Sequence, residues 1–198
     1  MKKNKRKWIV LLLATSCLLV VVLGSLAYFT AETRTRNVIT TGGVSVEVAE
    51  YADAEKTKPF PPEGVTGVMP GASVTKIAEV RNTGASPAWV RVKVEKKITL
   101  AEGVTGTPDE SLVTLDLDLS AWTEQDGWYY YGEPLRPGEA TPPLFTTVGF
   151  AASMQNVYQN STAEVTVTAQ AVQTANNGSS ALSAAGWPAG GTTGGDRP

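Results

Sequence analysis

Side chains able to perform acid–base or metal chemistry are scarce in this chain. Its 198 residues include no histidine and one cysteine, Cys17. This composition excludes His-based catalytic triads, the His-x-x-x-His zinc peptidase helix and most catalytic zinc sites. A carboxylate pair, a Ser/Lys dyad or an oxygen-ligand calcium site remains chemically possible. No spacing of Asp and Glu nominates a reacting pair, so we expect no catalytic residue, no cofactor and no enzyme activity.

Two clusters are candidates for ligand binding. Asp116 and Asp118 share one face of a predicted strand and could meet a calcium ion, although such a pair more often forms the solvated side of a strand. Trp122 and the aromatic run 128–131 could stack on sugar rings and form a glycan platform. Strand alternation divides the run between two faces, which predicts that half of it belongs to the core.

The N-terminal segment has the pattern of an export signal. Five basic residues lie within positions 2–7, and an almost wholly apolar run follows from Trp8 to Leu23. Ser25-Leu26-Ala27 then presents small residues at the two positions that a signal peptidase reads. We therefore predict a signal peptide over residues 1–27, cleaved before Tyr28. The protein is then secreted and extracellular.

This segment has two other interpretations, an uncleaved membrane anchor and a lipoprotein. The apolar stretch from Trp8 to Ala27 has 20 residues, close to the ~20 that span a bilayer, so an uncleaved anchor is an alternative. A lipoprotein modified at Cys17 fits poorly, because apolar residues continue directly past the cysteine.

Cleavage changes the charge and the redox chemistry of the chain. It removes five of the 17 basic residues and none of the 19 acidic ones, which leaves 12 basic residues and a net charge of −7. This charge gives no electrostatic basis for binding nucleic acid. The only cysteine also leaves, so the remaining 171 residues must form a core without disulfides.

The region after the leader shows the period-2 alternation of β-strands. Val44, Val46 and Val48, for example, alternate with more polar residues. The predicted strands are 44–48, 72–81, 89–98, 113–119, 122–124, 128–131, 144–150 and 163–172. Short helices are compatible with 100–112 and 153–159. Seven or eight strands with Gly- and Pro-rich turns predict an all-β, jelly-roll-type sandwich of two sheets.

Turn residues and composition give the domain limits. Asn82-Thr83-Gly84 and Gln125-Asp126-Gly127 are predicted turns, and Pro70-Gly71 and Pro137-Gly138 are predicted corners before strands. The expected organisation is a donor segment over 28–43, a sandwich domain over 44–174 and a tail over 175–198. The tail is rich in Asn, Gly, Ser, Ala and Thr, which predicts disorder.

Several of these motifs together resemble the TasA/camelysin family of bacterial extracellular proteins. The resemblance extends over most of the chain up to Gln173. The matching motifs are Ala27-Tyr28-Phe29-Thr30, Asn37, Thr41-Gly42-Gly43-Val44, Met69-Pro70-Gly71, Val80-Arg81-Asn82-Thr83-Gly84, Tyr129-Tyr130-Tyr131, 135–141, Leu144-Phe145 and 169–173. One departure is Ala31 before Glu32, where the family usually has an acidic residue soon after the Phe-Thr pair.

The resemblance implies a jelly-roll subunit of biofilm-matrix fibres, processed by a SipW-type signal peptidase. In such fibres the new N-terminus of one subunit completes a sheet of the next, which implies a homopolymer with possible accessory fibre or matrix proteins. Camelysin-like relatives have been described as metallopeptidases, but this sequence offers no histidine ligand. We therefore expect no metallopeptidase activity here.

The residues themselves permit strand donation. One alternating set is Phe29, Ala31, Thr33, Thr35 and Asn37, and the other set is more charged. A strand with these two faces suits addition to an open sheet edge. The alternative function is a membrane-tethered β-sandwich that binds glycan or protein.

Overall fold

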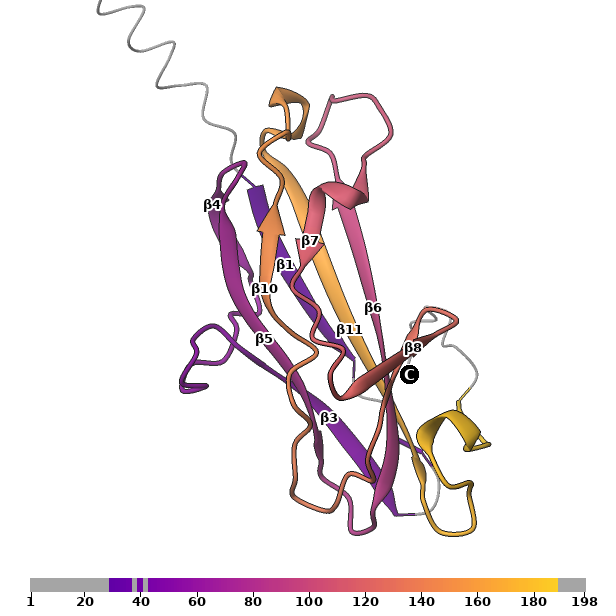
Figure 1. Cartoon of the computed structure of the whole chain (residues 1–198). Helices are drawn as coiled ribbons and strands as arrows, with labels where there is room; N and C mark the ends of the chain where they lie inside the picture. The colour runs from indigo at the N-terminus through magenta and orange to yellow at the C-terminus, as the bar shows by residue number, and fades with distance from the viewer. Residues whose placement is uncertain (1–28, 37–38, 41–42, 189–198) are drawn as a thin grey trace, which may run out of the picture.

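A computed structural model describes residues 29–36, 39–40 and 43–188, which form a sandwich of two β-sheets (Figure 1). The predicted all-β, two-sheet fold is confirmed. The first sheet runs in the order β4 (Val65–Val68), β1 (Phe29–Arg36), β11 (Ser161–Gln173), β6 (Ala88–Thr99), β9 (Trp128–Tyr131) and β8 (Trp122–Gln125). The second runs in the order β2 (Ile39–Thr40), β3 (Val44–Tyr51), β5 (Ser73–Asn82), β10 (Phe145–Phe150) and β7 (Val113–Leu115).

The long antiparallel pair of β6 and β11 forms the centre of the first sheet. Its register is continuous from Thr162 opposite Thr99 to Gln173 opposite Ala88. Alternation along β11 buries every second residue from Ala163 to Ala171, and these residues belong to the main core. This is the half-buried pattern that the sequence predicts for a strand with one face on a core.

The predicted turn at Asn82-Thr83-Gly84 anchors one end of the sandwich. The Asn82 side chain is fully buried, donates to the carbonyls of Ser86 (2.9 Å) and Leu135 (2.8 Å), and accepts from the Gly84 N–H (2.9 Å). A Cβ on Gly84 would lie 2.6 Å from the Ser45 backbone nitrogen. Only glycine therefore fits where this turn approaches β3.

The two predicted corners and the predicted hairpin are present. Gly71 and Gly138 have φ near +80°, with values of 80° and 79°, and each follows a proline. Asp126 and Gly127 both have positive φ, 54° and 75°, in the two-residue connection from β8 to β9. Such a connection favours Asp-Gly because both positions need a left-handed conformation.

The predicted strand over 113–119 is too long. β7 ends at Leu115, and the side chains of Leu117 and Leu119 are 36% and 47% exposed. The Asp116 carboxylate accepts hydrogen bonds from the backbone of Thr146 and Thr147, at 2.8 Å and 2.6 Å, so a side chain takes part of the role of the strand ladder. Alternation of Leu and Asp continues in the sequence past the regular ladder, although the Asp118 N–H still donates to the Leu144 carbonyl at 2.8 Å.

Short elements account for the other differences. β2 and β4 have two and four residues and were not predicted. The segments that were compatible with helices contain the 3-10 helices η1 (Glu110–Leu112) and η2 (Asn156–Tyr158), and a third, η3 (Ala181–Ser183), follows β11.

The expected disorder of the tail is wrong for residues 175–188. This segment contains η3, and Ala181 and Ala184 are buried with Trp89, Tyr130 and Val172 in a cluster separate from the main core. Composition predicted disorder because it cannot show that aromatic side chains on the sheet provide a binding surface. The rest of the predicted tail, 189–198, lies outside the described residues.

Candidate functional site

The N-terminal strand β1 lies inside the first sheet, between β11 and β4 (Figure 1). It runs parallel to β11 in an unbroken register from Phe29 opposite Ser161 to Arg36 opposite Thr168. On its other side it pairs antiparallel with β4, Phe29 opposite Val68 and Ala31 opposite Val65. The first strand of the described chain therefore fills a position between two others, which we call the β1 slot.

Beside the β1 slot, β11 carries a buried and mostly apolar row of side chains that faces the core. Ser161, Ala163, Val165 and Val167 are each between 1% and 3% exposed. The intervening residues, Thr162, Glu164, Thr166 and Thr168, are half-buried. This part of β11 has β6 on one side and β1 on the other. A strand at the position of β1 is therefore needed to pair the backbone N–H and C=O groups along the second edge of β11.

The strand on the other side of the slot, β4, depends on β1 even more strongly. In the sheet order β4 stands at the edge, and β1 is its only strand neighbour among the described residues. Val68 is buried and belongs to the main core. β4 is therefore joined to its sheet only through the N-terminal strand.

The predicted polymerisation residues occupy one alternating set of β1. Phe29, Ala31, Thr33 and Thr35 lie in register with Ser161, Ala163, Val165 and Val167, the buried row of β11. Asn37 and the predicted cleavage residues Ser25, Leu26, Ala27 and Tyr28 lie outside the described residues.

β4 is the part of the slot that sequence reasoning missed. Its four residues, Val65 to Val68, include Gly67 with φ of 75°. A strand this short, with a glycine in a left-handed conformation, has no readable alternation. The available signal was the pair Val65 and Val68 in a connection rich in proline and glycine, and it is weak.

The aromatic cluster is distributed over both faces of the first sheet. Trp122 lies in the main core, with Tyr129 and Tyr131 packed against that core. Tyr130 and Trp128 instead belong to the second cluster, under residues 181–187. The division by alternation is as expected, but the outward half is covered by the chain's own C-terminal segment and offers no open platform for a sugar.

The two aspartates act as backbone acceptors. Beyond the Asp116 contacts described above, Asp118 accepts from the Ser120 N–H at 2.9 Å. Desolvation opposes ionisation of Asp116, but hydrogen bonds from Thr146 and Thr147 outweigh it and lower its pKa. Among the described residues, no group of three or more His, Cys, Asp or Glu side chains is placed to hold a metal ion.

The structure also contains a buried lysine, which the sequence did not single out. Lys76 is 2% exposed, and its ammonium lies 2.6 Å from a Glu50 carboxylate oxygen and 4.5 Å from the centre of the Phe60 ring. Desolvation lowers its pKa, while the charge of Glu50 acts in the opposite direction. The ammonium is paired and covered, so the arrangement is that of a structural ion pair.

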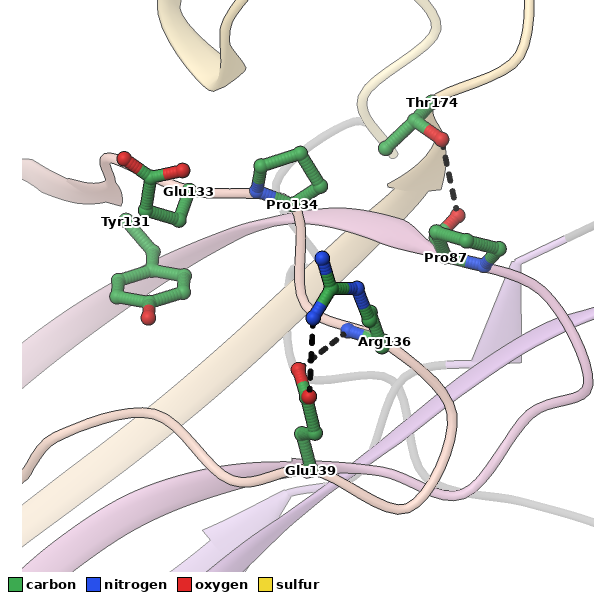
Figure 2. A pocket seen from close by; sticks show the side chains of 7 residues that line it. All are labelled: Pro87, Tyr131, Glu133, Pro134, Arg136, Glu139 and Thr174. Carbon is green, nitrogen blue, oxygen red and sulfur yellow. Dashed lines mark hydrogen bonds and ion pairs between the residues drawn. The ribbon is translucent and has the colours of Figure 1, made fainter.

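A hollow of about 430 Å³ lies at one end of the sandwich (Figure 2). Its lining residues are Pro87, Tyr131, Glu133, Pro134, Arg136, Glu139 and Thr174. Arg136 and Glu139 neutralise each other at 3.6 Å, and both are well exposed. Desolvation, with the charges of Glu133 and Glu139, raises the pKa of Tyr131. The hollow thus presents a solvated ion pair and no activated nucleophile.

Comparison of the chain with protein-family models, with curated proteins and with solved structures finds no match. Over the part that the structure describes, no helix has the length and hydrophobicity needed to cross a membrane. Of the arrangements described above, the β1 slot has the geometry best suited to accepting a polypeptide strand.

Proposed function

We propose that this protein is a secreted structural subunit of extracellular biofilm-matrix fibres that polymerises by donating its processed N-terminal strand to the next subunit. The observation that carries the proposal is the position of β1. The first strand after the predicted cleavage site is held between two other strands, β11 and β4. A terminal strand in this position can be exchanged between copies without altering the fold.

Strand exchange preserves the contacts that the slot requires. In the closed chain, the backbone of β1 follows β11 over eight residues. The same ladder forms when the strand comes from a neighbour, so exchange costs little beyond the entropy of association. An open chain would instead expose the edge of β11 and leave β4 without a strand partner, which favours capture of another strand.

Processing controls the availability of the strand in this scheme. The predicted cleavage between Ala27 and Tyr28 would place the new N-terminus one residue before β1. A SipW-type signal peptidase is the proposed processing partner, as the resemblance to the TasA/camelysin family implies. The head-to-tail contact is heterologous, and contacts of this kind generate open filaments when the rotation between subunits does not close a ring.

The decisive experiment compares two purified chains, one starting at Tyr28 and one at Val38. The first should form filaments in electron micrographs, and the second should not. A synthetic peptide of residues 28–37 should bind the shorter chain and raise its melting temperature without giving filaments. This peptide control separates loss of folding from loss of donation.

Equal filament formation by both chains would contradict the proposal. Mass spectrometry of the exported protein provides the second check. An intact leader, together with particles that stay single at high concentration, would instead favour the membrane-tethered binding module.

A further inference from the structure

An amine and a carboxylate meet on the buried face of the second sheet. Glu50 continues the buried row of β3 that begins at Val44, and Lys76 belongs to the same alternating set of β5 as Ala78 of the main core. The register places Glu50 opposite Ala78, so Lys76, two residues away, is its diagonal neighbour. The side chains of Glu50 and Lys76 are 5% and 2% exposed. Two adjacent strands thus bring these groups to one interior position.

Phe60 covers this pair from the edge of β3. The Phe60 N–H donates to the Glu50 carbonyl at 2.9 Å, which places residue 60 directly beside Glu50. Phe60 is 7% exposed, and its ring centre lies 4.5 Å from Lys76 Nζ. The same nitrogen lies 2.6 Å from Oε1 of Glu50. Nitrogen and carboxyl group are therefore in contact at a position shielded from bulk water.

An ion pair is a costly way to join two strands at such a position. Loss of hydration opposes most of the attraction between the charges, and apolar side chains of similar size often stabilise a core at least as well. An amide carries no charge and tolerates burial better than two ions do. Desolvation lowers the pKa of Lys76, which favours the neutral and nucleophilic amine. Burial thus favours a reaction that removes both charges.

We propose that Lys76 and Glu50 form an intramolecular isopeptide bond that joins β5 to β3 in the folded chain. The ammonium first passes one proton to the carboxylate within the pair. Nζ then attacks Cδ of the carboxylic acid, and the bond from Cδ to one carboxyl oxygen breaks. That oxygen leaves as water, with the carboxyl proton and one proton from the nitrogen. The step is a condensation that needs no co-reactant, and it is promoted by contact between the reacting groups and by exclusion of water.

The bond would supply a covalent staple to a chain that otherwise has none. After the predicted cleavage no cysteine is left for a disulfide. A link between residues 50 and 76 closes a loop that contains β4, the strand whose only strand neighbour among the described residues is β1. Closure of a loop restricts the unfolded chain, as a disulfide does. The inference does not rest on the proposed function, because both residues belong to one chain.

Mass spectrometry of the folded chain starting at Tyr28 tests the inference. The intact mass should be lower by one water than the mass calculated from the sequence, and trypsin should no longer cleave after Lys76. Digestion should give one branched peptide that joins the segment containing Glu50 to the segment containing Lys76. The ion pair of Lys56 and Glu79 is the internal control. Lys56 is 38% exposed, so this pair should stay unlinked.

Two variants separate the isopeptide bond from a plain ion pair. Lys76→Arg keeps the positive charge without a nucleophilic amine, and it should have the full calculated mass. The double variant Lys76→Met with Glu50→Leu should fold with an apolar pair and should also keep the full mass. Loss of water that persists in either variant would overturn the inference. Full mass and separate peptides from an unaltered chain that melts cooperatively would overturn it as well.

Discussion

The two ends of the described chain are attached to the same long strand in different ways. β1 joins the edge of β11 through a backbone ladder that runs from residue 161 to residue 168. Residues 175–188, which we call the C-terminal clasp, pack on the outer face, where Trp187 and Pro188 contact Arg91 of β6. A backbone ladder accepts many sequences of suitable shape, whereas an aromatic and arginine cluster selects particular side chains. The comparison predicts a general attachment at the N-terminus and a selective one at the C-terminus.

The strongest way to test this comparison is to delete each end in turn. Removal of residues 28–37 should lower the free energy of unfolding by on the order of 5 kcal/mol, because a ladder and an apolar slot are lost. Removal of 175–198 should cost about 2 kcal/mol, because the separate cluster is lost and the main core stays closed. Denaturant unfolding measures both values, and a larger loss from the C-terminal deletion would reverse the comparison.

Substitution within β11 tests the buried face of the strand that borders the slot. Val167→Asp places a charge at a position that is 1% exposed, and we expect a loss of about 4 kcal/mol. The neighbouring Thr168→Asp is the matched control, because it is half-buried and alternates to the other face. Its cost should stay below about 1 kcal/mol. Thermal melting of both variants provides the check.

Arg91 tests the selectivity of the outer face. Arg91→Ala should lower the free energy of unfolding by about 2 kcal/mol. The stacking contacts are lost, and the buried side-chain oxygen of Gln170 loses its hydrogen bonds from Arg91. Arg91→Lys should recover less than half of this loss, because an ammonium lacks the planar fork that bonds Gln170 and stacks on Trp128. Full recovery by lysine would show that charge alone holds the cluster.

A glycine pair tests whether the shape of the clasp is required. Gly178→Ala puts a Cβ 2.7 Å from the Ser183 hydroxyl at φ of 73°, so it should cost about 1.5 kcal/mol. Gly186→Ala has a similar φ of 77° but meets nothing within 4 Å, and should cost about 1 kcal/mol. Differential hydrogen exchange of residues 175–188 should show greater opening in the first variant. Equal exchange in the two would argue against a preformed clasp.

The smallest expected effect is the acid dependence of stability at Asp116, which follows β7 in the second sheet. Asp116 has a lowered pKa in the folded state, so its contribution is complete above its unfolded pKa of about 4 and declines as pH falls through the lower folded pKa. Asp116→Asn should reduce stability by less than about 1 kcal/mol at neutral pH. Unfolding measured from neutral to acidic pH should show this difference shrinking in acid. A constant difference would mean that ionisation of Asp116 is not involved.

The sequence was most predictive where strands were long and alternating. The pattern of Val165, Val167 and their neighbours gave both the strand and its buried face. Likewise, Asp126-Gly127 gave the hairpin, because tight turns need positive φ. The set Phe29, Ala31, Thr33 and Thr35 was identified from alternation as well, and the register places it opposite the buried row of β11.

Prediction failed where contacts distant in sequence determine structure. β4 owes its place in the sheet to β1, more than 25 residues before it. The clasp was assigned to disorder because its own composition is polar and small, while the aromatic platform that binds it lies on β6 and β9. The predicted strand after Val113 was too long, because alternation does not record where side-chain contacts such as those of Asp116 interrupt the regular ladder.

The sequence alone determined the leader pattern, the scarcity of catalytic side chains, and the alternation that requires a two-sheet core. These are properties of local composition and period, which the chain carries without any partner. Tertiary structure decided which strand lies beside which. It therefore decided that β1 fills a slot and that the last described segment, residues 175–188, covers Arg91. Neighbour relations depend on contacts between residues far apart in the chain, and no local pattern encodes them.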